Sequence, residues 1–262
     1  MTTNSGFSYR IIAPLRSESG KGGLSGECFL AQGSDDHAYK VRRCSNKEKL
    51  CKYLKNMEAV RHLVFFPEIK CVNGTDMVIH FVDGRDARMD EPSSFFHELG
   101  ALVAQLHKIK PGPANPSQRF YEKIDYLLCT GVLSVAQYDK LCDRYATLES
   151  EVNLQGSMEF DDISPSNIRI TPEGRIYFVD EPSLGHRAKG IGFAKPYLKW
   201  FTQEQRSAFE KGYSTVADLS FFTKAYETLV SLVFLAGNTA SRIHRNEPSY
   251  QASLRQMFLQ IP

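Results

Sequence analysis

The first third of the chain alternates short apolar runs with turn residues, a pattern typical of antiparallel β-strands. Five runs predict strands, at residues 9–15, 27–32, 37–43, 69–72 and 77–82. The last two are joined through Asn73-Gly74, a dipeptide that favours a tight hairpin turn. Between the third and fourth runs, apolar residues from Leu50 to Val60 recur at helical spacing, which predicts a helix capped by Ser45. We therefore expect a five-stranded sheet that carries one helix.

Beyond residue 83 the apolar positions follow a helical period instead. Helices are predicted at residues 95–109, 118–128, 134–152 and 202–245, and again after Pro248. One short hairpin interrupts them, with strands at residues 168–170 and 175–179. These patterns predict an α+β fold with two lobes. A small N-terminal antiparallel β lobe with one helix would span residues 1–83, and a larger, mostly helical C-terminal lobe would span residues 84–262.

Composition narrows the class of protein. With 42% apolar and 24% charged residues, the chain is close to the average of soluble globular proteins. A net charge of +2 lacks the basic excess of a protein that binds nucleic acid, and the most apolar stretch, Leu229–Ala236, is too short to span a membrane. The six cysteines are irregularly spaced and the first eight residues do not resemble a secretory signal. A cytoplasmic protein with reduced thiols is expected, and no oligomeric state is predicted.

Asp162, Asn167 and Asp180 form the first candidate constellation, around the short hairpin. Phosphoryl transfer from ATP needs a carboxylate that orients or deprotonates the attacking hydroxyl, and oxygen ligands that hold Mg²⁺ on the nucleotide phosphates. An aspartate, an asparagine five positions on and a second aspartate at the end of a hairpin supply these groups. Each residue alone could instead be a cap or a turn residue. Together, with a lysine in the upstream sheet, they favour the catalytic interpretation.

The second constellation lies in the predicted sheet. The loop between the first two strands contains Gly22 and Gly23, and glycines let backbone amides approach phosphate oxygens closely. Lys40, in the third strand, would give a fixed cation for the phosphates, and a glutamate on the following helix usually orients such a lysine. Glu58 is the first candidate and Glu48 the second. The loop matches neither GxGxxG nor GxxxxGK[ST] and could be a plain hairpin loop, and Lys40 could face solvent.

The order of these residues resembles the aminoglycoside-phosphotransferase and choline-kinase branch of the protein-kinase-like fold. The resemblance covers nearly the whole chain. It rests on Lys40, Glu58, a hinge at residues 79–84, Gln105-Leu106-His107, residues 162–167, Asp180 and Ser207–Tyr213, which is similar to the helix-ending FxxGY segment of that branch. It implies a bilobal protein-kinase-like fold, with ATP and Mg²⁺ as cofactors.

The resemblance also implies roles for individual residues. Asp162 would be the catalytic base, Asn167 and Asp180 the Mg²⁺ ligands, Lys40 with Glu58 the phosphate-positioning ion pair, and the backbone at Phe81 and Val82 the contact for adenine.

The chain departs from the family's pattern at two positions. Phe160 stands where the family usually has the histidine of His-Gly-Asp, and Gly192 stands where it tends to have the aspartate of Asp-x-Ala. A carboxylate that stabilises a loop in the family is therefore either missing here or supplied from elsewhere in the chain.

The leading hypothesis is an ATP-dependent kinase that transfers the γ-phosphoryl group to a hydroxyl of a small molecule, of the aminoglycoside, sugar or amino-alcohol type. One alternative is a catalytically silent kinase-like module that binds nucleotide or a partner protein. A divergent protein kinase is another, although Asp180-Glu181-Pro182 lacks the glycine of that class and no Ala-Pro-Glu segment follows. An acidic pocket that attracts polycationic acceptors could be provided by Glu159, Asp161, Asp162 and Glu181.

Overall fold

The structure is a computed structural model that describes residues 6–15, 27–109 and 116–261. The chain divides into two compact units, each of which is built from two segments. The first unit contains Met1–Glu91 and Ser164–Gly185, and the second contains Pro92–Ile163 and His186–Pro262. The division expected at residue 83 therefore differs from these units, because the short hairpin belongs with the N-terminal sheet.

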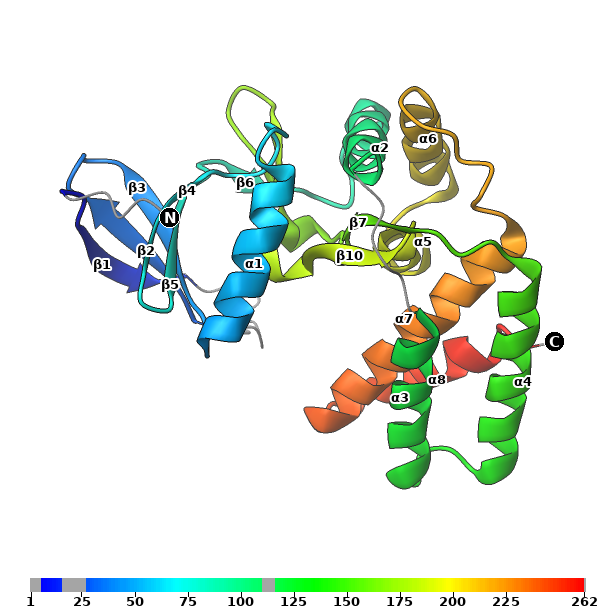
Figure 1. Ribbon diagram of the computed structural model, residues 1–262. Coiled ribbons are helices and arrows are strands. Elements are labelled where there is room, and N and C mark those ends of the chain that lie inside the picture. The colour runs from blue at the N-terminus through cyan, green and yellow to red at the C-terminus, as the bar shows by residue number, and fades with distance from the viewer. Residues whose placement is uncertain (1–5, 16–26, 110–115, 262) are drawn as a thin grey trace. The chain divides into compact units, whose positions relative to one another are not determined.

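A five-stranded antiparallel sheet forms the body of the first unit, as the sequence predicts (Figure 1). Its strands are, in spatial order, β1 (Tyr9–Pro14), β2 (Glu27–Gly33), β3 (Ala38–Arg43), β5 (Asp76–His80) and β4 (Ile69–Asn73). The central strand β3 pairs with β2 and β5. Since successive side chains of a strand point to opposite faces, Tyr39 and Val41 share one face of β3 and Lys40 and Arg42 share the other. This alternation brings two cations to the same side of the sheet.

One helix, α1 (Lys47–Val60), lies against this sheet and confirms the predicted element. Its N-cap is Asn46, whose side chain accepts a hydrogen bond from the backbone N–H of Lys49. The predicted cap, Ser45, is therefore wrong by one residue. Leu50 of α1 packs in one buried cluster with Ile79 of β5, so apolar burial fixes the helix on the sheet.

The short hairpin consists of β8 (Ile168–Ile170) and β9 (Ile176–Phe178), and β8 also pairs with β6 (Arg85–Asp86). The 3₁₀ turn η1 (Pro165–Asn167) precedes β8, and η2 (Glu181–Ser183) follows β9. Phe178 anchors the hairpin, because its backbone N–H donates to the Phe65 carbonyl at 3.0 Å and the two rings lie 5.7 Å apart. These contacts explain why the hairpin joins the first unit.

In the second unit, α2 (Ser93–His107) packs closely along α6 (Gln203–Ser214). A side chain at Gly100 would place its Cβ 2.0 Å from the Phe209 carbonyl oxygen, and one at Gly212 would place it 1.7 Å from the His97 carbonyl oxygen. Only glycine fits at such approaches of two backbones. The glycine of the predicted FxxGY segment is thus a packing residue.

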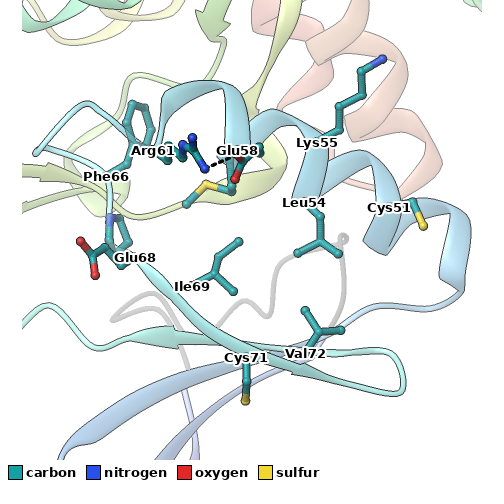
Figure 2. Close-up of a pocket in the computed structure, with 12 residues that line it drawn as sticks. Cys51, Leu54, Lys55, Glu58, Arg61, Phe66, Glu68, Ile69, Cys71 and Val72 are labelled. Carbon is teal, nitrogen blue, oxygen red and sulfur yellow. Dashed lines mark ion pairs between the residues drawn. The ribbon is translucent and has the colours of Figure 1, made fainter. Parts of the chain in front are cut away.

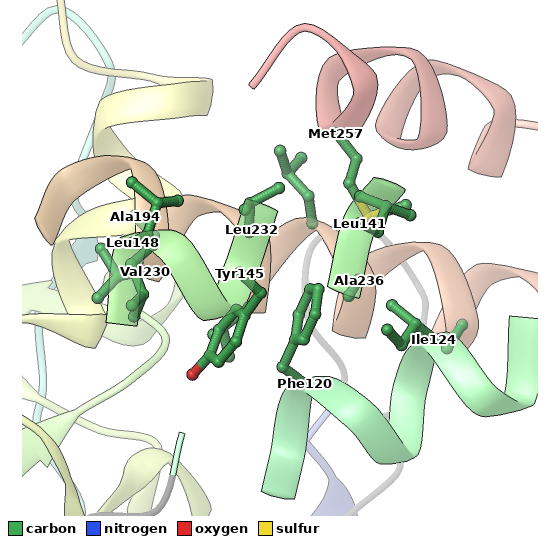
Figure 3. Close-up of a cluster of buried hydrophobic side chains, with 14 of the residues drawn as sticks. Phe120, Ile124, Leu141, Tyr145, Leu148, Ala194, Val230, Leu232, Ala236 and Met257 are labelled. Atoms are coloured by element: carbon green, nitrogen blue, oxygen red, sulfur yellow. The ribbon is translucent and has the colours of Figure 1, made fainter. Parts of the chain in front are cut away.

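The main core of the second unit lies among four further helices. They are α3 (Pro116–Cys129), α4 (Val135–Glu151), α7 (Lys224–His244) and α8 (Tyr250–Phe258). Figure 3 shows Phe120 and Tyr145 at the centre of this core, and their rings stack with centroids 4.2 Å apart. Ser134 and Gln137 form a capping box that starts α4, as the sequence position of Ser134 suggests. The stretch 202–245, predicted to be helical, contains two helices, α6 and α7, which are separated by residues 215–223.

The sequence patterns missed several short elements. The strand β7 (Gly156–Phe160) forms a two-stranded sheet with β10 (Leu184–Ala188), whose last three residues belong to the second unit. The 3₁₀ turn η3 (Ile191–Phe193) then leads into α5 (Ala194–Lys199). Such short elements carry too few residues to show a period. Among the residues that the structure describes, no helix is both long enough and apolar enough to cross a membrane.

Candidate active site

A cavity of 320 Å³ in the first unit brings together most of the residues predicted for the nucleotide. Lys40 lines it from β3, Phe81 and Val82 from the segment after β5, Asn167 from η1, and Asp180 from the end of the hairpin. This volume lies within the range of small-molecule pockets. Gly22 and Gly23, also predicted for this site, lie outside the described residues.

Lys40 is held at the end of the hairpin. Its Nζ donates to the Val179 carbonyl oxygen at 2.5 Å and lies 2.9 Å from both carboxylate oxygens of Glu181. The side chains of Lys40 and Glu181 are 14% and 2% exposed, so this ion pair is nearly shielded from water. The two partners of the lysine amine, Val179 and Glu181, are the residues directly before and after Asp180.

Glu58, predicted to be the partner of Lys40, lies elsewhere. Its carboxylate pairs with Arg61 at 2.6 Å, and its side chain is 64% exposed (Figure 2). Glu58 lines a separate, larger cavity of 880 Å³ between α1 and β4, which does not include Lys40. The predicted ion pair is corrected: Glu181 takes the place of Glu58, because the helical phase of α1 turns Glu58 away from the strand lysine.

Arg42 completes a balanced group of four charges with Lys40, Asp180 and Glu181. Its Nε donates to Glu181 at 2.8 Å and its Nη2 to Asp180 at 3.1 Å, although its side chain is only 4% exposed. Burial alone would raise the pKa of the Glu181 carboxyl, but Lys40 and Arg42 lower that pKa below its usual value. For Asp180, burial dominates and raises the pKa despite the same two cations. Two cations and two carboxylates therefore neutralise each other beside the cavity.

Asn167 and Asp180 are suited to hold a divalent cation on a nucleotide. The backbone N–H of Val179 donates to the Asn167 carbonyl at 3.0 Å, which sets the end of β9 beside η1. One amide oxygen and one carboxylate are hard donors of the kind that Mg²⁺ prefers, with nucleotide phosphates and water completing the shell. Within the described chain, no group of three or more acidic, histidine or cysteine residues could hold a metal by itself. Asn167 and Asp180 would therefore fit Mg²⁺ that is also bound by nucleotide phosphates.

The segment after β5, which is predicted to contact adenine, lines the same cavity through Phe81 and Val82. The backbone N–H of Phe81 donates to the Ala38 carbonyl at 3.2 Å and so belongs to the sheet. A contact from Phe81 to a base would therefore use its carbonyl oxygen. The role of Phe81 and Val82 in binding adenine stays a prediction.

Asp162, the predicted base, belongs to the second unit. Its carboxylate forms an ion pair with Lys195 of α5 and its side chain is 39% exposed. The neighbouring Asp161 is only 15% exposed and accepts from Arg187 Nε at 2.7 Å and Arg119 Nη1 at 3.2 Å. Asp162 thus presents the more accessible carboxylate of the two, whereas Asp161 is bound between two guanidinium groups.

The loop-stabilising carboxylate that the sequence lacks at Gly192 is supplied by Glu159 of β7. Its oxygens accept from the backbone N–H groups of Gly190 at 2.8 Å and Gly192 at 3.4 Å. His107 Nε2 lies 2.6 Å from Glu159, and Tyr213 hydrogen-bonds to the other ring nitrogen at 2.8 Å. A Cβ at residue 192 would lie 2.5 Å from the Phe160 carbonyl oxygen, so only glycine fits there. The departure at Gly192 is therefore accommodated by a buried network around Glu159.

Sequence reasoning missed the parts played by Glu181, Arg42, Lys195 and Glu159. Only Arg42 had a local signal, since it lies two positions after Lys40 in a strand and must share its face. The partners of the other three are distant in the sequence, as in the 141-residue separation between Lys40 and Glu181.

A five-stranded antiparallel sheet that carries one helix and a short hairpin, together with a helical second unit, gives the chain a protein-kinase-like fold. Among solved structures, the chain is similar to the choline kinase LicA from Streptococcus pneumoniae, with a TM-score of 0.72 and 13% identity over 95% of this chain and 94% of that one. LicA in complex with AMP gives a TM-score of 0.67 at 14% identity, over 99% and 94% of the two chains.

An aminoglycoside phosphotransferase from Alicyclobacillus acidocaldarius is similar as well, with a TM-score of 0.61 and 14% identity over 95% of this chain and 88% of that one. No protein-family model matches the sequence, and no curated protein matches it either. The predicted resemblance in fold is confirmed. At these identities the likeness establishes the fold alone.

Proposed function

We propose that the protein is an ATP- and Mg²⁺-dependent kinase that transfers the γ-phosphoryl group to a hydroxyl of a small molecule. One observation carries the proposal: Lys40, Asn167 and Asp180 line one cavity although they come from distant parts of the sequence. A fixed amine and two oxygen donors are the groups that phosphoryl transfer needs around a triphosphate. The fold shared with choline and aminoglycoside kinases agrees with this chemistry.

Each residue has a role in the proposed reaction. Lys40, oriented by Glu181, binds the nucleotide phosphates, and Asn167 with Asp180 would hold Mg²⁺ on them. Bound MgATP would supply the phosphoryl group that is transferred, with ADP as the product. Asp162 accepts the proton of the acceptor hydroxyl, because its carboxylate is accessible whereas that of Asp161 is bound by two arginines.

Replacing Asp162 tests the proposal. Asp162→Asn keeps the shape of the side chain but removes its basicity, so ADP release in the presence of an acceptor should fall at least about 100-fold. MgATP binding, measured by isothermal titration calorimetry, should stay within about twofold of wild type. Asp139→Asn makes the same chemical change on the exposed surface of α4 and should leave both quantities unchanged.

Two outcomes would contradict the proposal in different ways. Full turnover by Asp162→Asn would mean that another group is the base. A wild-type protein that binds MgATP but shows no turnover with a broad set of hydroxyl acceptors would instead be the silent module considered from the sequence.

A further inference from the structure

Among the residues that the structure describes, three cations form ion pairs with the two aspartates that follow β7. Arg119 of α3 and Arg187 of β10 both donate to Oδ2 of Asp161, and Lys195 of α5 pairs with Asp162. All five side chains belong to the second unit. Counting each of these five described side chains as charged at neutral pH, three positive and two negative charges leave one positive charge in excess.

The four acids that the sequence suggested as an acidic pocket do not form one in the structure. Glu159 is buried, and its carboxylate is bound to His107 and to backbone N–H groups. Glu181 is buried in the first unit against Lys40 and Arg42. Of the four acids, only Asp161 and Asp162 belong to this surface, and both are neutralised by cations. The surface therefore offers little attraction to a polycationic acceptor.

The positive charge next to Asp162 would act on any acceptor that approaches this carboxylate. A hydroxyl must come within hydrogen-bond reach of Asp162 to lose its proton, so neighbouring groups of the acceptor come close to Lys195 and the two arginines. An ammonium group there would meet an excess of positive charge. A carboxylate or phosphate group would be attracted, and Arg119 is suited to bind it: its side chain is 46% exposed, and its bond to Asp161 uses only Nη1 of the five guanidinium donors.

We infer that the acceptor is an anionic alcohol, with a carboxylate or phosphate group near the hydroxyl that is phosphorylated, and that Arg119 binds this anionic group. The inference rests on the proposed kinase function. It excludes choline, ethanolamine and aminoglycosides as preferred acceptors, since each carries a cationic nitrogen near its hydroxyl groups.

A charge-sorted extract tests the inference. A polar cell extract is separated by ion exchange into anionic, neutral and cationic fractions. Each fraction is incubated with the 262-residue chain, Mg²⁺ and ATP labelled at the γ-phosphate. Label should enter organic products chiefly in the anionic fraction. In that fraction, at limiting acceptor, Arg119→Gln should lower the rate at least about tenfold, and salt should weaken the preference. The KM for ATP should not change.

Lys123→Gln is the matched control, because it removes one positive charge one helical turn further along α3 and should leave the rate unchanged. Label that enters chiefly the cationic or the neutral fraction would overturn the inference while the kinase function stands. A rise in the KM for ATP in Arg119→Gln would also overturn it, since the cation would then serve the nucleotide. Absence of label from all three fractions would overturn the proposed function itself.

Discussion

Glu181 forms ion pairs with two cations, Lys40 and Arg42, away from water. Removing one partner of a buried ion pair costs about 3–5 kcal/mol, because the opposite charge stays buried without compensation. We expect Glu181→Gln to lower the free energy of unfolding by about 3 kcal/mol, measured by chemical denaturation. MgATP binding should weaken at least about tenfold, since the Lys40 amine loses the group that orients it.

Glu58→Gln is the control for this change, since it alters the same functional group on the exposed side of α1. Its free energy of unfolding should change by less than about 0.5 kcal/mol, and its affinity for MgATP should match wild type. The reverse result, with weaker binding in Glu58→Gln and normal binding in Glu181→Gln, would restore the partner predicted from the sequence.

At the scale of elements, α6 and α7 are joined by a bidentate ion pair. Arg206 of α6 donates through Nη1 and Nη2 to the two oxygens of Glu227 in α7, at 2.7 and 3.1 Å. Arg206 also donates to Glu210 at 2.8 Å and lies 4.1 Å from the centroid of the Tyr197 ring. Fixed on three sides, this guanidinium loses little entropy in forming the pair, so the pair should contribute to stability.

The contribution of Glu227 should depend on pH. Burial alone would raise the pKa of Glu227, but the hydrogen bonds and charge of Arg206 lower it below its ordinary value of 4.5. The unfolded chain then takes up the proton first as pH falls, so stability from the pair is present above 4.5 and is lost below it. Near neutral pH, Glu227→Gln should cost about 1–2 kcal/mol in urea denaturation.

Urea denaturation of wild type and Glu227→Gln at acidic pH tests whether the ion pair with Arg206 causes the difference in stability. The difference between wild type and Glu227→Gln should shrink as the pH falls through the folded-state pKa of Glu227. Glu151→Gln, on the exposed C-terminal end of α4, should show no difference at either pH. A difference for Glu227→Gln that grew on acidification would rule out the ion pair as its cause.

For the whole molecule, MgATP should act as a folding ligand, since its cavity is assembled from strands and turns that exist together only in the folded chain. At about one hundred times its dissociation constant, a ligand specific for the folded state adds about 2.7 kcal/mol. We expect the thermal midpoint to rise with MgATP and to lose most of that rise on addition of EDTA. An equal rise with ATP alone in wild type would argue against Asn167 and Asp180 as metal ligands.

Local patterns were sufficient to predict the five-stranded sheet, α1 and the hairpin that separates Asn167 from Asp180. These elements were visible because strand alternation and turn residues act over a few positions. A shared site for Lys40 and Asp180 was instead predicted from the chemistry of phosphoryl transfer and from the family resemblance, and both residues line one cavity. Element boundaries were less well predicted. Helix α1 is capped by Asn46 and not by the predicted Ser45. The elements β7 and α5 were too short to show a period in the sequence.

Tertiary packing alone decided which charges meet. Glu58 and Glu181 are both glutamates, and the sequence does not show which of them is the partner of Lys40. Only the fold shows that Glu181 lies against Lys40. In the same way, Arg119 and Arg187 reach Asp161 across separations of 42 and 26 residues. Sequence periodicity fixes the direction of a side chain within its own element, whereas its partner depends on how distant elements pack, and that is a property of the folded chain.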